Sequence, residues 1–184
     1  MSAILTCHLM GIDMEYIRSA LKNFSVKGRV EPVWVSDNFT LLIDYAHNGV
    51  STESILTTIR EYKPKRIVTI FGCGGNRSRD RRYEMGEIAG KYSDYCIITE
   101  DNNRFEEFDD IAKDILVGMS KTDCEYIIIS DRKEAIKYAI ENGQKGDIIM
   151  LIGKGHEDYK EIKGVKYPFD ERVVIKEILD EINK

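Results

Sequence analysis

The sequence predicts an α/β fold. It should be a mostly parallel sheet with helices on both faces, a short N-terminal hairpin, and a C-terminal hairpin followed by a helix. Runs such as RIVTIFG (66–72) and DIIMLIG (147–153) are apolar almost throughout, as expected of strands that are buried on both faces. These runs alternate with segments whose apolar residues recur at helical spacing, as expected of the helices that connect parallel strands.

Each element can be justified in order along the chain. MEYIRSALKNF (14–24) has helical periodicity, and VKGRV (26–30) ends that helix with a glycine. Residues 30–47 predict two short strands around the turn residues Ser36, Asp37 and Asn38. The same criteria predict the remaining elements: helix 52–62, strand 66–72, helix 80–92, strand 94–99, helix 106–119, strand 125–130, helix 132–143, strand 147–153, a hairpin over 158–169 that turns at Lys163 and Gly164, and a helix over 171–182.

Composition excludes several classes of function. The formal net charge of −5 over 184 residues argues against nucleic acid or an anionic membrane as a partner. The four cysteines form no CxxC pair, so we expect reduced thiols and a cytoplasmic protein. Cys73 lies in a glycine-rich loop where a thiol can be exposed, but no base accompanies it. The three histidines lack metal-ligand spacing and no apolar run approaches transmembrane length, so we expect no metal site and no membrane span.

Ligands of parallel sheets bind outside the carboxyl ends of the strands, which directs attention to the loops that follow them. One such loop, GCGGNRSRDRR (72–82), contains neither GxGxxG nor GxxxxGK[ST]. It offers backbone amides and several arginines at a helix start, a combination suited to binding an anion. A solvated helix start, with the arginines paired to Asp80 and Glu84, is the alternative. The arginines concerned are Arg77, Arg79, Arg81 and Arg82.

Three further post-strand loops carry polar residues. In EDNNR (100–104) an Asx turn and helix cap would explain one or two residues, but not Arg104 as well. Acceptors for an ammonium group beside a guanidinium for a carboxylate suit an amino-acid ligand. In GKGHEDYK (153–160) the glycines allow close approach of backbone to a ligand, and Glu157 is the better ligand-facing residue than His156. In DYAH, Asp44 and His47 fit a purine nucleoside better than a general-base pair.

Six motifs in order resemble the C-terminal domain of the Mur ligases, over nearly the whole chain, and this resemblance implies a Rossmann-like α/β fold. The resemblance is closest to the members that add the third residue of the cell-wall peptide. SAILTCHLMGIDMEYIRSAL (2–21) resembles the closing helices of the family's central ATP-binding domain. The resemblance therefore implies a boundary between residues 1–27 and a C-terminal domain over 28–184. The motifs are GR (28–29), DYAH (44–47), FGCGGNR (71–77), DNNR (101–104), GKGHED (153–158) and FDER (169–172).

The resemblance also implies roles for individual residues. On the nucleotide side, Arg29 would reach the phosphates, Asp44 the ribose and His47 the adenine. The incoming diamino acid would be bound by a second group, with Lys154 and His156 as further candidates. That second group is Arg77, Asp101, Asn102, Arg104, Gly153 and Glu157.

The implied activity belongs to a longer protein. There, ATP and Mg2+, bound mainly by the central domain, would activate the D-glutamate carboxylate of UDP-N-acetylmuramoyl dipeptide. The amine of meso-diaminopimelate would then attack the acyl phosphate. This domain would position the amine and exclude water, so we expect no catalytic residue in it and no activity of this chain alone. A monomer acting in peptidoglycan synthesis is expected.

Several departures from the family pattern leave alternatives open. Asn103 and Phe108 stand where the family has proline, and Asn76 stands for aspartate. A buried Arg104 would be unpaired beside L-lysine, which lacks a second carboxylate, and this favours diaminopimelate. An L-lysine-adding member, a cyanophycin synthetase or folylpolyglutamate synthase domain, and a non-catalytic amino-acid or nucleotide-binding module remain the alternatives.

Overall fold

A six-stranded sheet with five neighbouring strands parallel forms the centre of the molecule, as the computed structural model shows for residues 2–22 and 25–182. The first strand pairs antiparallel with the second, which gives the predicted N-terminal hairpin. All other pairings in this sheet are parallel, which confirms the predicted fold class. In spatial order the strands are β1 (Glu31–Val35), β2 (Phe39–Asp44), β6 (Asp147–Ile152), β3 (Arg66–Phe71), β4 (Tyr95–Ile98) and β5 (Glu125–Ile128).

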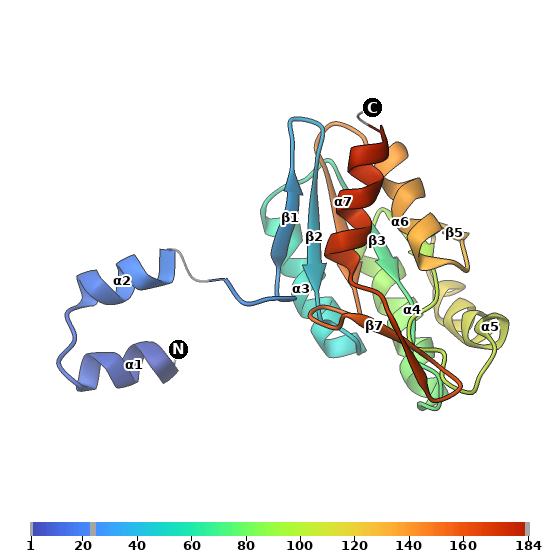
Figure 1. Ribbon diagram of the computed structural model, residues 1–184, viewed down its shortest axis with the longest axis horizontal. Helices are drawn as coiled ribbons and strands as arrows, with labels where there is room; N and C mark the ends of the chain where they lie inside the picture. Colours follow the sequence, from blue (N-terminus) through green and yellow to red (C-terminus); the bar gives the residue numbers. More distant parts are fainter. Residues whose placement is uncertain (1, 23–24, 183–184) are drawn as a thin grey trace.

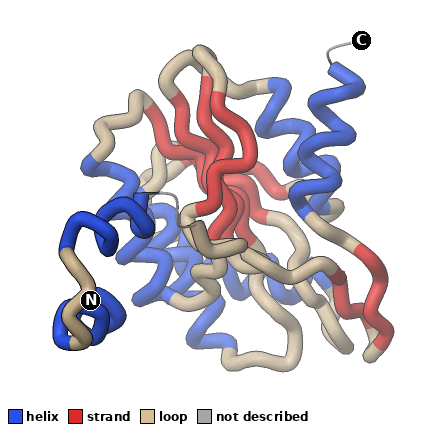
Figure 2. The backbone as a smooth tube through the Cα atoms, turned by 60° about the vertical axis from the view of Figure 1, so that its left-hand side comes forward, coloured by secondary structure: helices blue, strands red, loops and turns tan. Residues whose placement is uncertain are grey.

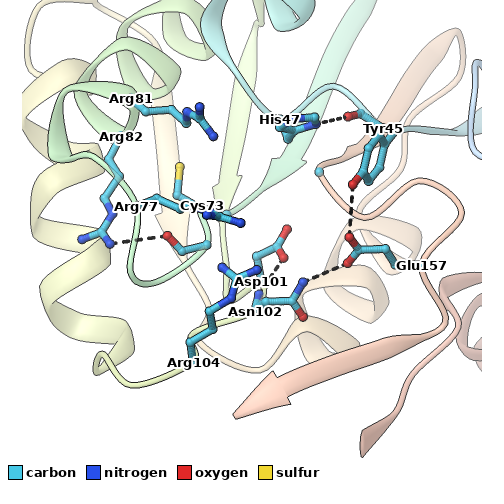
Figure 3. Close-up of a pocket in the computed structure, with 13 residues that line it drawn as sticks. Tyr45, His47, Cys73, Arg77, Arg81, Arg82, Asp101, Asn102, Arg104 and Glu157 are labelled. Atoms are coloured by element: carbon cyan, nitrogen blue, oxygen red, sulfur yellow. Dashed lines mark hydrogen bonds between the residues drawn. The ribbon is translucent and has the colours of Figure 1, made fainter. Parts of the chain in front are cut away.

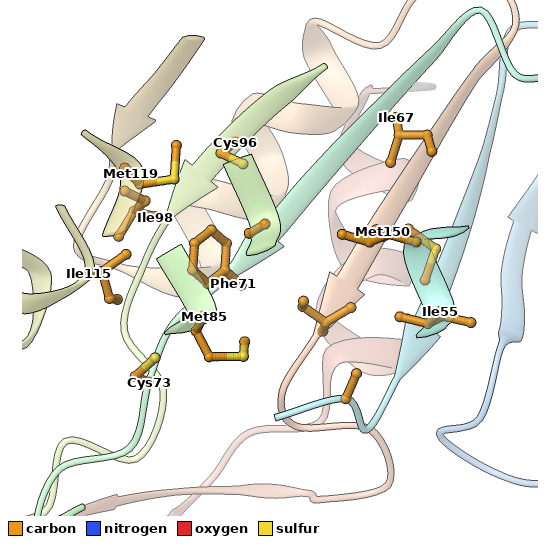
Figure 4. Packing of buried hydrophobic residues seen from close by; sticks show 14 of the residues in the cluster. Ile55, Ile67, Phe71, Cys73, Met85, Cys96, Ile98, Ile115, Met119 and Met150 are labelled. Atoms are coloured by element: carbon orange, nitrogen blue, oxygen red, sulfur yellow. The ribbon is translucent and has the colours of Figure 1, made fainter. Parts of the chain in front are cut away.

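Helices cover both faces of this sheet, and each face has its own core (Figures 1 and 2). One core is built around Phe71, Met85 and Ile115 (Figure 4). It packs the sheet against α3 (Gly49–Glu61), α4 (Arg79–Tyr92) and α5 (Phe108–Met119). The other core packs the opposite face against α6 (Arg132–Glu141) and α7 (Glu171–Ile182). Because both faces of the inner strands β6, β3 and β4 are buried, these strands are apolar almost throughout rather than alternating.

Capping side chains set two of the helix boundaries. α3 begins at Gly49, three residues before the predicted start, because the Asn48 side chain accepts a hydrogen bond from the Ser51 amide at 2.9 Å. Asp131 caps α6 in the same way by accepting from the Glu134 amide at 3.0 Å. Such caps satisfy amides that have no partner within the helix.

Two helices precede the sheet, α1 (Ser2–Leu9) and α2 (Met14–Lys22), and they lie apart from it (Figure 1). Leu5, Leu9 and Met10 are exposed there, and α1 has no buried residue. The predicted end of the second helix at residues 23–24 lies outside the described residues. Among the described residues, no helix is long and apolar enough to cross a membrane, and no cluster of side chains suits a metal ion.

The C-terminal hairpin forms as predicted, from β7 (Tyr159–Ile162) and β8 (Val165–Pro168), with its turn at Lys163 and Gly164. It is bonded to the loop that follows β4. The Arg104 amide donates to the Glu161 carbonyl at 2.9 Å, and the Lys163 amide donates to the Arg104 carbonyl at 2.7 Å. The hairpin and this loop are therefore joined by backbone as well as by side chains.

A fully buried ion pair lies behind the carboxyl ends of the strands. The Arg132 side chain, 0% exposed, donates from Nε to Glu171 Oε1 at 2.8 Å, and Glu171 is 1% exposed. The two terminal nitrogens of Arg132 donate to two backbone carbonyls. These are the carbonyl of Glu100, just beyond β4, at 3.1 Å and that of Ile152, at the end of β6, at 3.0 Å. One guanidinium thus joins the starts of α6 and α7 to two of the loops at this edge of the sheet.

Replacing Arg132 by alanine should lower the free energy of unfolding by about 3–5 kcal/mol, because Glu171 would remain as a buried, uncompensated charge. Urea denaturation followed by circular dichroism measures this change. Lys133→Ala is the matched control, since its ion pair with Glu177 is exposed on both sides (41% and 52%) and should change the unfolding midpoint within experimental error. Equal effects of the two substitutions would contradict the structural role of the buried pair.

Candidate functional site

A pocket of about 130 Å3 lies at the carboxyl ends of the parallel strands (Figure 3). All six residues expected to bind a diamino acid line it, although they come from three loops of the chain. Acidic and amide side chains lie on one side and arginines on the other, as Figure 3 shows. The lining consists of Tyr45, His47, Gly72, Cys73, Gly74, Arg77, Arg81, Arg82, Asp101, Asn102, Arg104, Gly153 and Glu157.

Asn102 organises the acidic side of the pocket. Its Nδ2 donates to Glu157 Oε2 at 2.8 Å, which orients that carboxylate. Its Oδ1 accepts from the Glu161 amide at 2.9 Å and from Lys154 Nζ at 3.1 Å. The buried carboxamide therefore uses both of its ends to connect the loop after β4 with the loop and hairpin after β6.

Lys154, a further candidate from the sequence, does not line the pocket but lies fully buried beside the acidic residues. Its Nζ donates to the Tyr159 carbonyl at 2.8 Å and lies 3.7 and 3.8 Å from the carboxylates of Asp101 and Glu157. Burial lowers the pKa of Lys154, and the charge of Asp101 opposes that effect. The ammonium group thus compensates part of the negative charge on this side.

Gly153 belongs to the pocket through its backbone rather than through a side chain. Its φ of +113° is a conformation that L side chains rarely adopt. A Cβ atom at this position would lie 2.7 Å from Asp101 Oδ2. Glycine therefore allows the loop after β6 to approach the Asp101 carboxylate.

The arginines differ sharply in how they are used. Arg82 is buried and donates to Glu106, at 2.7 and 2.8 Å, and to Asp114 at 2.9 Å. Arg77 and Arg81 have no hydrogen-bond or ion-pair partner within the described part of the chain, although both line the pocket. The alternative pairing of these arginines with Asp80 and Glu84 does not occur among the described residues.

Arg104 is already paired with a carboxylate. Its Nε donates to Glu161 Oε2 at 3.1 Å and its Nη1 to the Gly75 carbonyl at 2.9 Å, while Nη2 has no partner among the residues described. The expectation that Arg104 would be left unpaired beside L-lysine is therefore wrong, because Glu161 supplies its counter-charge. Its φ of +52° lies in the left-handed region and is held by the two backbone bonds to the C-terminal hairpin.

Of the three nucleotide-side candidates, only His47 lines the pocket, and its Nδ1 lies 2.8 Å from the Tyr45 carbonyl oxygen. Asp44 is buried, and its carboxylate accepts from the amides of Val30 at 2.9 Å and Ala46 at 2.8 Å. The Arg29 guanidinium lies over the Tyr45 ring, 4.9 Å from its centroid. Asp44 thus holds the backbone beside Arg29 and His47.

Sequence reasoning missed Tyr45, and it named Arg81 only as part of a candidate anion-binding loop, not among the residues that bind the diamino acid. Tyr45 lines the pocket and its hydroxyl donates to Glu157 Oε1 at 3.3 Å. Its position directly after a buried strand and before His47 was the available signal. His156, by contrast, is exposed outside the pocket and its ring lies 4.8 Å from that of Tyr45.

Cys73 is buried at the pocket wall, not exposed. Burial raises the pKa of its thiol from 9.0 to about 12. Cys124 is only partly buried, and hydrogen bonding with Cys96, at a sulfur–sulfur distance of 3.8 Å, lowers the pKa of Cys124.

Comparison with known proteins gives consistent results. The family model described as "Mur ligase, glutamate ligase domain" matches residues 28–155. The UDP-N-acetylmuramoyl-L-alanyl-D-glutamate--2,6-diaminopimelate ligase of Caldanaerobacter subterraneus subsp. tengcongensis is 46% identical over 184 residues, and its Aquifex aeolicus counterpart 50% identical over 169 residues. A solved structure of a ligase with that name has a TM-score of 0.80 and 31% identity, covering 99% of this chain and 37% of its own. The alignments cover 100% and 92% of this chain but only 38% and 35% of the two relatives.

The burial of Cys73 predicts that it resists alkylation in the folded protein. Raising a thiol pKa from 9.0 to about 12 lowers the reactive thiolate fraction at pH 8 by about a thousandfold. Labelling with iodoacetamide and peptide mass spectrometry should therefore show Cys124 modified long before Cys73. Labelling in urea should remove the difference, and equal native rates would contradict the buried placement.

Proposed function

Because this chain belongs to the Mur ligase family, we propose that it is the C-terminal domain of a ligase that adds meso-diaminopimelate to UDP-N-acetylmuramoyl-L-alanyl-D-glutamate. Two relatives of that name, 46% and 50% identical, support this assignment. Residues 28–184 form the domain, and residues 1–27 close the central ATP-binding domain before it. The whole protein acts as a monomer in the cytoplasm, in peptidoglycan synthesis.

The distribution of uncompensated charge in the pocket carries this proposal. On one side, two carboxylates, Asp101 and Glu157, are partly balanced by the buried ammonium of Lys154, which leaves about one negative charge. On the other side, Arg77 and Arg81 have no counter-charge among the described residues. The pocket therefore suits a ligand with one ammonium group and two carboxylates.

meso-Diaminopimelate has this pattern in its reactive form. It carries two carboxylates and two amines, and the attacking amine must be neutral, so one ammonium group remains. L-Lysine offers the single ammonium but only one carboxylate, and would leave one guanidinium of the pocket without a partner. The charge pattern thus favours the dicarboxylic ligand without relying on Arg104.

The nucleotide side of the proposal involves Arg29 for the phosphates, Asp44 for the ribose and His47 for the adenine. The Asp44 carboxylate already accepts two backbone amides, so a ribose hydroxyl would share it. The described residues contain no cluster that suits a metal ion. Mg2+ would accompany ATP on the central domain.

The contribution of this domain to the reaction is positioning. The acidic side holds the distal ammonium group, and the arginines hold the carboxylates, so that the second amine faces the acyl phosphate formed on the other substrate. Attack of that amine forms an amide and releases phosphate, and closure of the domain excludes water that would hydrolyse the acyl phosphate. No side chain of the pocket is assigned as general base.

An amide NMR titration of this chain tests the proposal. We expect meso-diaminopimelate to shift the signals of Arg77, Asn102, Arg104 and Glu157, with a Kd about tenfold below that of L-lysine. One additional charge-assisted hydrogen-bonded contact of about 1.5 kcal/mol accounts for this difference. Equal Kd values for the two amino acids would contradict the charge argument.

Two substitutions in the same helix start sharpen this test. Arg81→Gln should raise the Kd of meso-diaminopimelate about tenfold, since one of its carboxylates loses a charged partner. Arg79→Gln is the control, because Arg79 is exposed (72%), lies outside the pocket and, among the described residues, pairs only with Asp114, at 3.6 Å. An equal effect of the two substitutions would reduce the role of Arg81 to nonspecific attraction.

A further inference from the structure

The ring of Tyr45 lies between the residues of the two proposed binding sites. Arg29 lies over it at 4.9 Å, and the His47 ring lies 4.8 Å away, so both nucleotide-side residues contact one aromatic ring. The hydroxyl at the other end donates to Glu157, a residue of the diamino-acid side, at 3.3 Å. Figure 3 shows this ring between His47 and Glu157 at the edge of the pocket.

Close packing restricts where the ring can lie. Gly155, with a φ of +54°, lies so near that a Cβ there would be 2.5 Å from the Tyr45 Cβ. His156 covers part of the ring, with 4.8 Å between the ring centroids. The half-buried side chain is therefore held between the loop after β2 and the loop after β6.

The Tyr45 hydroxyl helps to orient the Glu157 carboxylate by donating a hydrogen bond to one of its two oxygens. Tyr45 donates to Oε1 and Asn102 donates to Oε2, so each oxygen has a donor from a different loop. Burial, followed by the charge of Glu157, raises the pKa of Tyr45, so the phenol remains a donor at neutral pH. Without the Tyr45 hydroxyl, Oε1 loses its hydrogen-bond donor, and the carboxylate is oriented less strictly toward a ligand ammonium group.

We infer that Tyr45 is a positioning residue that couples the nucleotide side to the diamino-acid side of the pocket. A nucleotide bound by Arg29 and His47 acts on the ring between them, and the hydroxyl of that ring donates to the Glu157 carboxylate on the amino-acid side. This inference rests on the proposed function and assigns Tyr45 a role beyond it. Linkage requires the effect to be reciprocal, so the amino acid must tighten nucleotide binding by the same factor.

The coupling can be measured on this chain by NMR titration with meso-diaminopimelate, in the absence and presence of saturating ADP. In the unmodified chain we expect ADP to lower the Kd of meso-diaminopimelate by about fivefold, the lower end of common coupling factors. In Tyr45→Phe the ring remains but the hydroxyl is lost, so the coupling factor should fall to about one while ADP alone still binds. If the Tyr45 hydroxyl only supported the local structure, its removal would weaken the binding of both ADP and meso-diaminopimelate and leave the coupling factor unchanged.

Tyr62→Phe is the matched control, because Tyr62 is 76% exposed at the end of α3 and should keep the full coupling factor. Persistence of the factor in Tyr45→Phe would overturn the inference. The inference would also be overturned if the unmodified chain bound meso-diaminopimelate with the same Kd with and without ADP. That outcome would not contradict the proposed function. A chain that does not bind meso-diaminopimelate at all would contradict the proposed function and the inference with it.

Discussion

The buried pair of Arg132 and Glu171 is the interaction on which the arrangement of the site depends. A guanidinium has donors in a fixed, planar fork, and here that fork is aimed at one carboxylate and at two backbone carbonyls, one just beyond β4 and one at the end of β6. The carbonyls belong to Glu100 and Ile152, so they fix where the loops after β4 and β6 leave the sheet. Burying two charges is costly, and one carboxylate oxygen of Glu171 lacks a partner among the described residues. The pair is therefore better explained by the geometry it imposes than by the stability it contributes.

Two other buried cations, Lys154 and Arg82, also have a structural rather than a ligand-binding role. Lys154 lies beside the acidic side of the pocket and Arg82 beside its basic side, and each is balanced by carboxylates of the protein itself. Their charges are committed to holding the loops together. The charges that remain available to a ligand belong to more exposed residues, Arg81 in the first turn of α4 beside Arg82 and Arg77 in the loop just before that helix. The fold thus uses one set of charges to build the pocket and leaves a second set free within it.

Much of this architecture could be predicted from sequence, because it follows from local patterns. The strands have uniform apolar runs, the helices have regular spacing, and the loops after parallel strands must meet at one edge. All six residues predicted for the diamino acid line one pocket, and His47, predicted for the nucleotide, lines it as well. The partners of the charged side chains could not be predicted, since Arg104 pairs with Glu161 and Arg82 with Asp114, 57 and 32 residues away along the chain. Tyr45 was missed for a related reason, as its role depends on a hydroxyl contact with a residue 112 positions later.

The connection between the loop after β4 and the C-terminal hairpin has one more consequence. Arg104 is joined to β7 through its backbone, and its guanidinium is joined to Glu161 on the same strand. A displacement of the hairpin would therefore carry the cation and its counter-ion together as one body. It follows that the electrostatic character of this wall of the pocket does not depend on the exact position of the hairpin.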